Sequence, residues 1–322
     1  MAAPSVADTK LFFATDIHGS DTCMRKFLNA GRFYGCDVLV MGGDITGKMI
    51  VPIVAEAGGT HRARLFGTEE VVDATGLPAL RKRITDAGYY AYECDPDETA
   101  ALAADQAQVD ALFTRVMRET LLRWLQMAEE RLAGTGIVCL LAPGNDDPGF
   151  VDEVLRTSSR VVNPEGELVE LPGGHTLVSV GYANPTPWDS PRELPEDQLE
   201  ARIVAEAEKV PDPAKAVFNL HVPPKETPLD QAMLLDDQWR PVLQGGRPVI
   251  AGVGSSAVRA VVERYQPMLS LHGHIHESRG GTRIGRTTAI NPGSEYSEGV
   301  LRGAIVTLGG RKGVRGYQLV SG

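Results

Sequence analysis

Short apolar runs recur along the chain, and polar residues follow most of them. Uninterrupted apolar runs of this length are typical of β-strands that are covered on both faces. The runs occupy residues 11–15, 37–41, 137–142, 176–180, 216–220 and 268–271. Helices are predicted between them over 20–30, 196–209 and 255–265. This alternation predicts an α/β fold that ends in antiparallel strands at 287–290, 304–308 and 314–320.

The pattern changes between residues 48 and 134. Residues 51–73 alternate loosely around several glycines, which predicts a β-hairpin or a small meander. Residues 80–87 and 99–132 are predicted helices, and the second is long and amphipathic. No linker rich in Gly, Ser or Pro separates this stretch from its neighbours. We therefore interpret 48–134 as an accessory insertion within a single domain, 1–322, placed near the site or at a subunit contact.

Metal-ligating side chains stand where the predicted strands end. They are Asp16, His18, Asp44, Asn145, His221, His274 and His276. Asp and Asn also favour turns, but open α/β sheets place their sites at this edge, so we expect these side chains to converge. Mixed Asp, Asn and His ligation suits Mn, Fe, Zn or Co better than Ca or Mg. One metal ion that keeps a coordination position free for substrate needs fewer ligands than this. Seven ligands suit two divalent cations that share one carboxylate.

Five sequence blocks carry a resemblance to a known family. They are Asp16-x-His18, Gly43-Asp44, Gly144-Asn145, the isolated His221 and Gly273-His274-x-His276. In this order, each after an apolar run, the blocks resemble the signature of calcineurin-like metallophosphoesterases. The inserted segments and residues 290–294 are similar to those of the Icc-related predicted phosphoesterases, a branch of that family.

The resemblance implies a fold, a cofactor and a reaction. The implied fold is a four-layer α/β/β/α sandwich of two mixed sheets with the metal site at the strand ends. The implied ligands of the two ions are Asp16, His18 and His276 for one, Asn145, His221 and His274 for the other, and Asp44 as the bridge. A bridging hydroxide attacks phosphorus in line while the metals stabilise charge on the phosphoryl oxygens. Manganese is the metal that we favour.

One position departs from the family pattern. The family has a histidine after the Asn145 block that assists the leaving group, and this chain has Asp146 there. A carboxylate beside two dications stays ionised, so Asp146 is a poor general acid and repels anions. Esters with good leaving groups are therefore expected to react best. We keep Asp146 as a catalytic candidate and interpret Asp147 as an orienting partner.

The other histidines are less clearly assigned by the sequence. His272 lies two residues before His274, so it could face the same way along a strand. We keep His272 as a second catalytic candidate, with a place in the strand core as the alternative. His61 and His175 stand in turn-like segments and are predicted to be surface residues.

Composition narrows the class of protein. The formal net charge of -10 argues against a protein whose main partner is nucleic acid, because such proteins carry a basic face. The four cysteines include no CxxC pair and are predicted to be reduced and structural. The N-terminus lacks a signal-peptide pattern, and no apolar run approaches the ~20 residues that span a bilayer. These features predict a soluble cytoplasmic protein without a membrane partner.

Three functional hypotheses follow from the sequence. The first is hydrolysis of a phosphodiester, and less of a phosphomonoester, in a small molecule or nucleotide. The second is a nuclease that acts on nucleic acid ends, which the acidic charge disfavours. The third is a non-catalytic metal-binding scaffold of the same fold, disfavoured because every ligand type is present. The sequence leaves the substrate open and allows a homo-oligomer.

Overall fold

Two six-stranded sheets form the centre of the protein. The computed structural model describes residues 8–236, 238, 240–309 and 313–322. The first sheet has the order β20 (Gly313–Ser321), β19 (Arg302–Gly309), β1 (Thr9–Ala14), β2 (Val38–Met41), β7 (Val138–Leu141), β8 (Val161–Val162). The second has the order β17 (Gly280–Ile284), β18 (Thr287–Asn291), β16 (Leu269–Leu271), β11 (Ala216–Leu220), β10 (His175–Val180), β9 (Val169–Leu171).

Both sheets are mixed, as expected. Strands β1, β2, β7 and β8 run parallel, while β19 is antiparallel to β1 and β20. In the second sheet β10, β11, β16 and β18 run parallel, with β9 and β17 antiparallel at the edges. The prediction that residues 287–290 form an antiparallel tail strand is therefore half wrong. This strand, β18, makes a hairpin with β17 but lies parallel to β16 on its other side.

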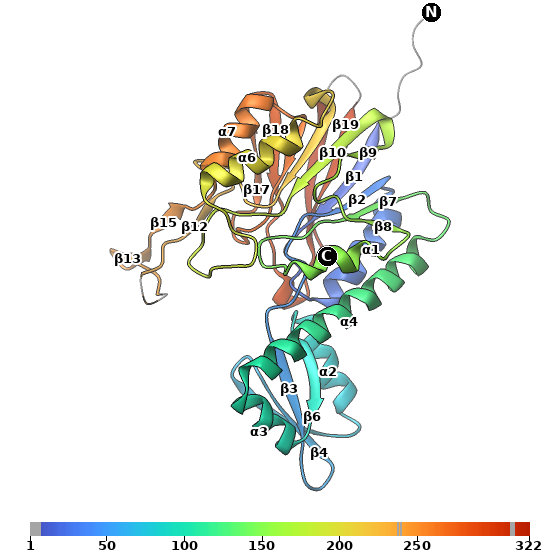
Figure 1. Ribbon diagram of the computed structural model, residues 1–322, viewed down its shortest axis with the longest axis vertical. Coiled ribbons are helices and arrows are strands. Elements are labelled where there is room, and N and C mark those ends of the chain that lie inside the picture. Colours follow the sequence, from blue (N-terminus) through green and yellow to red (C-terminus); the bar gives the residue numbers. More distant parts are fainter. Residues whose placement is uncertain (1–7, 237, 239, 310–312) are drawn as a thin grey trace, which may run out of the picture.

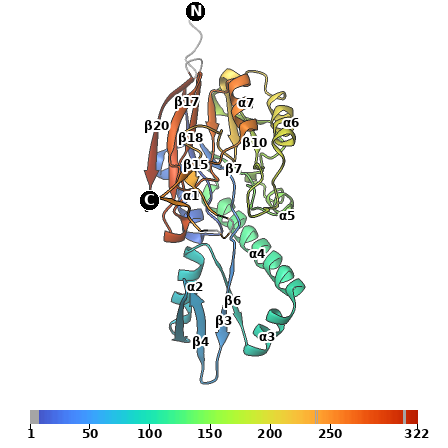
Figure 2. The ribbon, with the colours of Figure 1, turned by 90° about the vertical axis from the view of Figure 1, so that its left-hand side faces the viewer.

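Helices cover the outer faces of the two sheets and complete four layers (Figures 1 and 2). They are α1 (Asp21–Tyr34), α4 (Gln106–Leu132) and α5 (Phe150–Leu155) on the first sheet, and α6 (Glu196–Ala207) and α7 (Ser256–Tyr265) on the second. Apolar residues such as Phe13 and Val40 from one sheet and Val217 and Leu271 from the other fill the space between the sheets. The predicted α/β/β/α sandwich is confirmed.

Local sequence signals explain where the helices begin and end. The Ser20 side chain accepts a hydrogen bond from the Cys23 N–H and caps α1, and Ser255 caps α7 in the same way at Val258. Gly35 ends α1 in the left-handed region, with φ of 62°. The described residues also form short 3-10 helices at Pro172–Gly174, Pro213–Lys215 and Tyr296–Glu298. The cysteines Cys23, Cys36, Cys94 and Cys139 are free and buried.

Residues 50–104 form a separate small lobe, the inserted lobe, at the lower end of Figure 1. Its elements are β3 (Ile50–Ala55), β4 (Thr60–Leu65), β5 (Thr68–Asp73), α2 (Leu77–Asp86), β6 (Tyr90–Cys94) and α3 (Pro96–Ala104). The strand order is β5-β4-β3-β6, an antiparallel meander with β6 added parallel to β3. Side chains such as Val51, Ile53, Leu80 and Ile84 give the lobe its own apolar core.

The prediction of one continuous helix over 99–132 is wrong, because the structure has two helices there, α3 and α4. The break lies at Asp105, whose carboxylate accepts hydrogen bonds from the N–H groups that begin α4. The first half of α4 packs against Tyr90 of the inserted lobe, and its second half packs on the first sheet, where Leu121 and Trp124 are buried. The Trp124 indole also donates to Asp21 of α1 at 2.6 Å. The helix thus joins the lobe to the main body (Figure 2).

A β-arm that the sequence pattern does not predict extends from the main body at the left of Figure 1. It consists of β12 (Gln231–Met233) paired with β15 (Ile250–Gly252), and β13 (Leu243–Gln244) paired with β14 (Arg247–Pro248). These pairs are too short to show a clear alternation of polar and apolar residues. Among the helices of the described residues, none combines the length and apolarity needed to cross a membrane.

Candidate metal centre

The structure brings the seven predicted metal ligands to one place. Each stands in the loop that follows the carboxyl end of a parallel strand: β1 (Asp16, His18), β2 (Asp44), β7 (Asn145), β11 (His221) and β16 (His274, His276). Most are buried, but the His276 side chain is 31% exposed and opens the cluster to solvent. The site therefore lies where the corresponding ends of both sheets meet.

One group of donor atoms comes from Asp16, His18 and His276. The Nε2 atoms of the two histidines lie 3.1 Å apart, and His276 Nε2 lies 3.6 Å from Asp16 Oδ1. One ligand atom from each residue lies within 4.8 Å of the others, which is close enough to surround a cation. His18 and His276 of this group are separated by 258 residues in sequence, so the fold alone creates the group.

A second group of donor atoms adjoins the first. It contains Asp44, His221 and His274, again with one ligand atom each within 4.8 Å of the others. The His221 Nε2 lies 3.4 Å from Asp44 Oδ1. Asn145 joins this group through its Oδ1, which lies 2.8 Å from the Nδ1 of His274.

The carboxylate of Asp44 faces both groups. Its Oδ2 lies 3.7 Å from His18 Nε2 in the first group, and its Oδ1 lies 3.4 Å from His221 Nε2 in the second. This is the orientation that a carboxylate shared by the two divalent cations of a two-metal site would need. Asp44 Oδ1 also accepts a hydrogen bond from the Asp146 N–H at 2.9 Å, which fixes the carboxylate.

The backbone of the ligand loops is strained. Four of the predicted ligands have a positive φ, namely Asp16 (53°), His18 (37°), Asp44 (49°) and His274 (66°). Residues other than glycine rarely adopt this region, and such strain persists where the surroundings hold it. Here the loops after β1 and β2 hold each other, since the Asp16 N–H donates to Gly43 O and the His18 N–H to Asp44 O, both at 3.0 Å.

Two glycines that precede ligands have a specific steric role. A Cβ on Gly144 would lie 2.2 Å from Asp44 Oδ1, and a Cβ on Gly273 would lie 2.3 Å from Asp16 Oδ2. A side chain at either position would therefore push a predicted ligand out of place. These glycines therefore make room for the predicted ligands.

Asp147 ties two of the loops together. Its buried carboxylate accepts hydrogen bonds from the N–H groups of Gly144, Ile45 and Thr46 at 2.7 to 3.0 Å, and from the Thr46 hydroxyl at 2.6 Å. Burial, together with the charge of Asp44, raises the pKa of Asp147 to about 6. These donors occupy the carboxylate, so its position fits an orienting role.

Asp146 has partners that the sequence did not reveal. Its Oδ2 lies 2.6 Å from the Nζ of Lys48, and its Oδ1 accepts hydrogen bonds from the Ser190 hydroxyl at 2.6 Å and the Asn145 amide at 3.0 Å. A third donor-atom group contains Asp146 with His18 and Asp44. The Asp146 carboxylate therefore lies beside the predicted metal ligands and is paired with the ammonium group of Lys48.

Tyr296 is another neighbour that the sequence analysis missed. Its ring centroid lies 4.7 Å from that of His18 and 5.9 Å from that of His276. Tyr296 stands a few residues after the 290–294 segment, which was the available signal in the sequence. Its ring covers one side of the first donor group.

His272 is buried beside the centre rather than within a donor group. Its Nδ1 lies 2.8 Å from Leu220 O and 3.2 Å from Val222 O, so Nδ1 carries the proton and donates. Burial lowers the pKa of His272 to about 4, which keeps the ring neutral. These contacts agree with a place in the strand core, and a catalytic role for His272 remains a prediction.

The prediction for His175 is wrong. This residue begins β10 and is 1% exposed, because its ring lies against the 3-10 helix Pro213–Lys215, where Nδ1 is 3.2 Å from Lys215 O. His61 lies on β4 of the inserted lobe and is partly exposed. Neither histidine belongs to the donor-atom groups found in the described part of the chain.

The charges of the cluster fit divalent cations. Burial raises the pKa of Asp16, but His276, His221 and His18 outweigh burial and hold it well below its usual range. Burial lowers the pKa of His221, yet Asp44 and Asp16 raise it to about 10. The carboxylates thus attract positive charge strongly.

Unpartnered nitrogens point to the same kind of ligand. The buried side-chain atoms without a hydrogen-bond partner in the described residues include His18 Nδ1 and His221 Nε2 in the cluster, and also His175 Nε2 and His272 Nε2 outside the donor groups. An unpaired buried polar atom is costly, and His221 Nε2 lies within the second donor group, where a cation would give it a partner. The donor set and the charge of the cluster both fit divalent metal ions.

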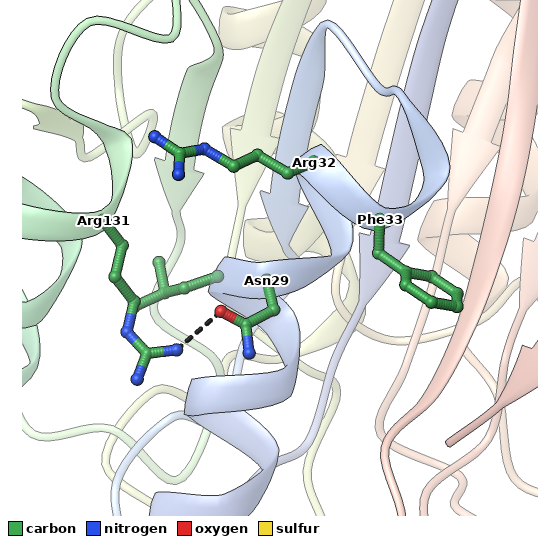
Figure 3. A pocket seen from close by; sticks show the side chains of 5 residues that line it. Asn29, Arg32, Phe33 and Arg131 are labelled. Carbon is green, nitrogen blue, oxygen red and sulfur yellow. Dashed lines mark hydrogen bonds between the residues drawn. The ribbon is translucent and has the colours of Figure 1, made fainter.

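A hollow on the main body lies apart from this cluster. Its volume is about 400 Å³, and it is lined by Leu28, Asn29, Arg32, Phe33 and Arg131 between α1 and α4 (Figure 3). The Arg131 guanidinium donates to Asn29 Oδ1 at 2.6 Å across it. None of the predicted site residues lines this hollow, so it does not change the assignment of the site.

Comparison with known proteins gives the fold but little about the substrate. No family model matches the sequence. The chain is 27% identical to the uncharacterized protein MJ1162 of Methanocaldococcus jannaschii over 156 residues, which are 48% of this chain and 62% of that protein. The match therefore spans less than two thirds of the length of this curated relative.

Solved structures align over almost the whole chain. One crystal structure has 16% identity, covers 98% of this chain and 99% of its own, and gives a TM-score of 0.57. TT1561 of Thermus thermophilus has 14% identity with the same coverage and a TM-score of 0.53. A 5'-nucleotidase precursor from the same organism gives only 0.39, at 10% identity over 98% of this chain and 54% of its own. The first two likenesses show that the chain shares its fold with these structures.

Proposed function

We propose that this protein is a metal-dependent phosphoester hydrolase with two divalent cations. The observation that carries the proposal is the Asp44 carboxylate, whose two oxygens face two separate groups of donor atoms. Asp16, His18 and His276 would hold one cation, and Asn145, His221 and His274 the other. Bound cations would activate water near neutral pH and stabilise charge on phosphoryl oxygens.

The side chains around the cluster fix the positions of the predicted ligands and leave a path for the substrate. The Asp147 carboxylate holds the loops after β2 and β7 together, so it fixes Asp44 and Asn145 relative to each other. The exposed side of His276 and the partly exposed Asp146 leave one side of the cluster open for a substrate. A preformed cluster of this kind lowers the cost of bringing water and ester together.

The preferred substrate class is a phosphodiester in a small molecule or nucleotide. Asp146 stands where the family has a histidine, and a carboxylate repels a dianionic monoester more than a monoanionic diester. The pairing of Asp146 with Lys48 weakens this repulsion, so we expect a preference rather than an exclusion. The net charge of -10 still disfavours a nuclease. A cytoplasmic location and a homo-oligomer remain predictions.

A screen of the metal-loaded protein tests this function. The protein is stripped with a chelator, reloaded with Mn, Fe, Zn or Co, and assayed with nitrophenyl diesters and monoesters. We expect two equivalents of metal, with faster turnover of diesters than of monoesters and of nitrophenyl than of alkyl leaving groups. A protein that binds two metals and hydrolyses neither ester class would instead support the scaffold hypothesis.

A further inference from the structure

The inserted lobe carries an exposed aromatic side chain on the turn between β4 and β5. This residue, Phe66, is 65% exposed and forms a two-residue loop with Gly67 between the paired ends of the strands. Phe66 and Gly67 both have a positive φ, of 50° and 79°, as type I′ turns require. Asn-Gly is the preferred pair in such turns, because a bulky residue is strained there. Neither the turn nor the exposure to solvent therefore explains a phenylalanine at this position.

The Phe66 ring packs on the ring of Tyr89, the residue before β6. The two centroids lie 5.7 Å apart and the ring planes are tilted by 53°. Tyr89 is only half-buried, so this aromatic pair presents ring surface to solvent. A single exposed apolar side chain is common on protein surfaces. Two rings in contact, one of them on strained backbone, indicate instead a surface that binds something.

The aromatic pair adjoins the loops of the metal centre. Gly88 precedes Tyr89 and is packed tightly against these loops. A Cβ added to Gly88 would lie 2.5 Å from the His18 carbonyl oxygen and 2.8 Å from Tyr296 Cδ2. The Tyr296 ring in turn lies 5.9 Å from the ring of His276, the histidine on the open side of the cluster. Aromatic rings therefore lead from the surface of the inserted lobe to the open side of the metal centre.

The aromatic pair and the metal centre suit two different parts of one ligand. A flat aromatic ring stacks on exposed aromatic side chains, and a phosphoryl group binds divalent cations. Gly88 and Tyr296 stand between the two places. A ligand that occupies both places therefore needs a spacer between its ring and its phosphorus atom. The sugar of a nucleotide is a spacer of this kind.

We propose that Phe66 and Tyr89 form a stacking site for an aromatic ring of the substrate, beside the metal centre. The substrate class is a phosphoester whose organic group ends in a flat ring on a spacer, as in a nucleotide. The inserted lobe then selects the substrate by its ring, while the metal centre acts on its phosphoryl group. This inference rests on the proposed function, because it assumes that a phosphoryl group enters the metal centre.

Two ligands that differ by the base test this site without turnover. The Mn-loaded protein is titrated by calorimetry with adenosine 5′-phosphate and with ribose 5-phosphate, which lacks the base. The variants are Phe66→Asn, which removes the ring and gives the turn its preferred Asn-Gly pair, and Phe66→Tyr, which keeps a ring. Phe33→Gln is the matched control. Phe33 is 79% exposed and packs on Tyr34 at 4.8 Å between centroids, but it lies on α1 beside the hollow of Figure 3.

We expect wild type to bind adenosine 5′-phosphate about tenfold more tightly than ribose 5-phosphate. Phe66→Asn should lose most of this difference while its affinity for ribose 5-phosphate and its thermal stability are kept. Phe66→Tyr and Phe33→Gln should keep the difference. Equal affinities of wild type for the two ligands would overturn the inference. So would a loss of affinity for ribose 5-phosphate in Phe66→Asn, because Phe66 would then act on the metal centre and not on the ring.

The same data separate this inference from the proposed function. If wild type hydrolyses esters but binds the two ligands equally, only the aromatic site is wrong. If the Mn-loaded wild type binds neither ligand and hydrolyses no ester, the proposed function fails and the aromatic site fails with it. Size-exclusion chromatography tests another occupant of the aromatic pair. A change from oligomer to monomer in Phe66→Asn would show that the pair covers a subunit contact, and would overturn the inference.

Discussion

The metal centre and the inserted lobe are constrained to very different degrees. At the centre, buried carboxylates and histidines hold each other through backbone of positive φ, and a methyl group on Gly144 or Gly273 would displace a ligand. In the lobe, the charged residues form solvent-exposed pairs such as Arg62 with Glu56. Exposed pairs contribute little to stability. The geometry of the centre therefore depends on nearly every residue in it, whereas the exposed ion pairs of the lobe contribute little.

The strongest test of this contrast removes the Asp44 carboxylate, which faces both donor groups. Asp44→Ala should lower kcat/KM by more than a hundredfold, because even residues that only orient metal ligands are worth roughly 10–100-fold. Asn145→Ala should act in the same direction. The control is Asp73→Ala in the inserted lobe, where the carboxylate accepts hydrogen bonds from Thr75 and Gly76. Wild-type turnover in Asp44→Ala with excess manganese would contradict the two-cation proposal.

A smaller effect is expected from the carboxylate that ties the loops together. Asp147→Asn keeps the shape of the side chain but turns an amide N–H toward N–H groups that now donate to the carboxylate. We expect manganese affinity to fall by about 10–100-fold, as for other residues that orient metal ligands. Calorimetric titration of the apo-protein with manganese measures it. Unchanged affinity would show that the loops keep their places without Asp147.

A change in the inserted lobe beside Lys48 should reach the centre through the pairing of Lys48 with Asp146. Tyr90→Phe removes the hydroxyl that accepts from Gly47, at a cost of roughly 1–3 kcal/mol in unfolding free energy. We expect KM to rise several-fold with kcat nearly unchanged. Tyr92→Phe is the matched control, because Tyr92 lies on the same strand and its hydroxyl contacts Glu98 and Arg115 instead. Equal KM and kcat values in the two variants would show that the lobe does not affect substrate binding through Tyr90.

The smallest effect is expected at the surface of the lobe. Arg81→Gln breaks an exposed ion pair with Glu93, and such pairs contribute about 0–1 kcal/mol. Thermal unfolding should shift by no more than a few degrees, and kcat/KM should match wild type. A large loss of activity in this variant would mean that the lobe acts on the centre by a route other than Lys48 or the aromatic pair.

The sequence predicts the centre better than its surroundings for a physical reason. Each predicted ligand directly follows an apolar run, and the carboxyl ends of parallel strands in packed sheets meet at one edge, so local patterns are enough. Lys48 and Ser190 belong to different loops and meet Asp146 only through the folded chain, and Ser190 stands 44 residues from Asp146 in the sequence. The spacing of polar and apolar residues along the sequence does not predict contacts between distant loops.

Some local signals were present but ambiguous. The break before α4 could be read from Asp105, since Asp favours the N-cap, but the apolar spacing on both sides of it suggested one helix. His175 looked like a turn residue because two glycines precede it, although it begins a strand of the buried second sheet. In both cases the structure of the segment depends on tertiary packing, which the local sequence pattern does not contain.

Anomalous X-ray diffraction from crystals of the manganese-loaded protein would locate the bound metal ions. We expect two anomalous peaks, one among Asp16, His18 and His276 and one among Asn145, His221 and His274. Asp44 should lie between them with one oxygen toward each. A single peak at full manganese loading, or two peaks outside these groups, would show that the proposed two-cation centre is wrong.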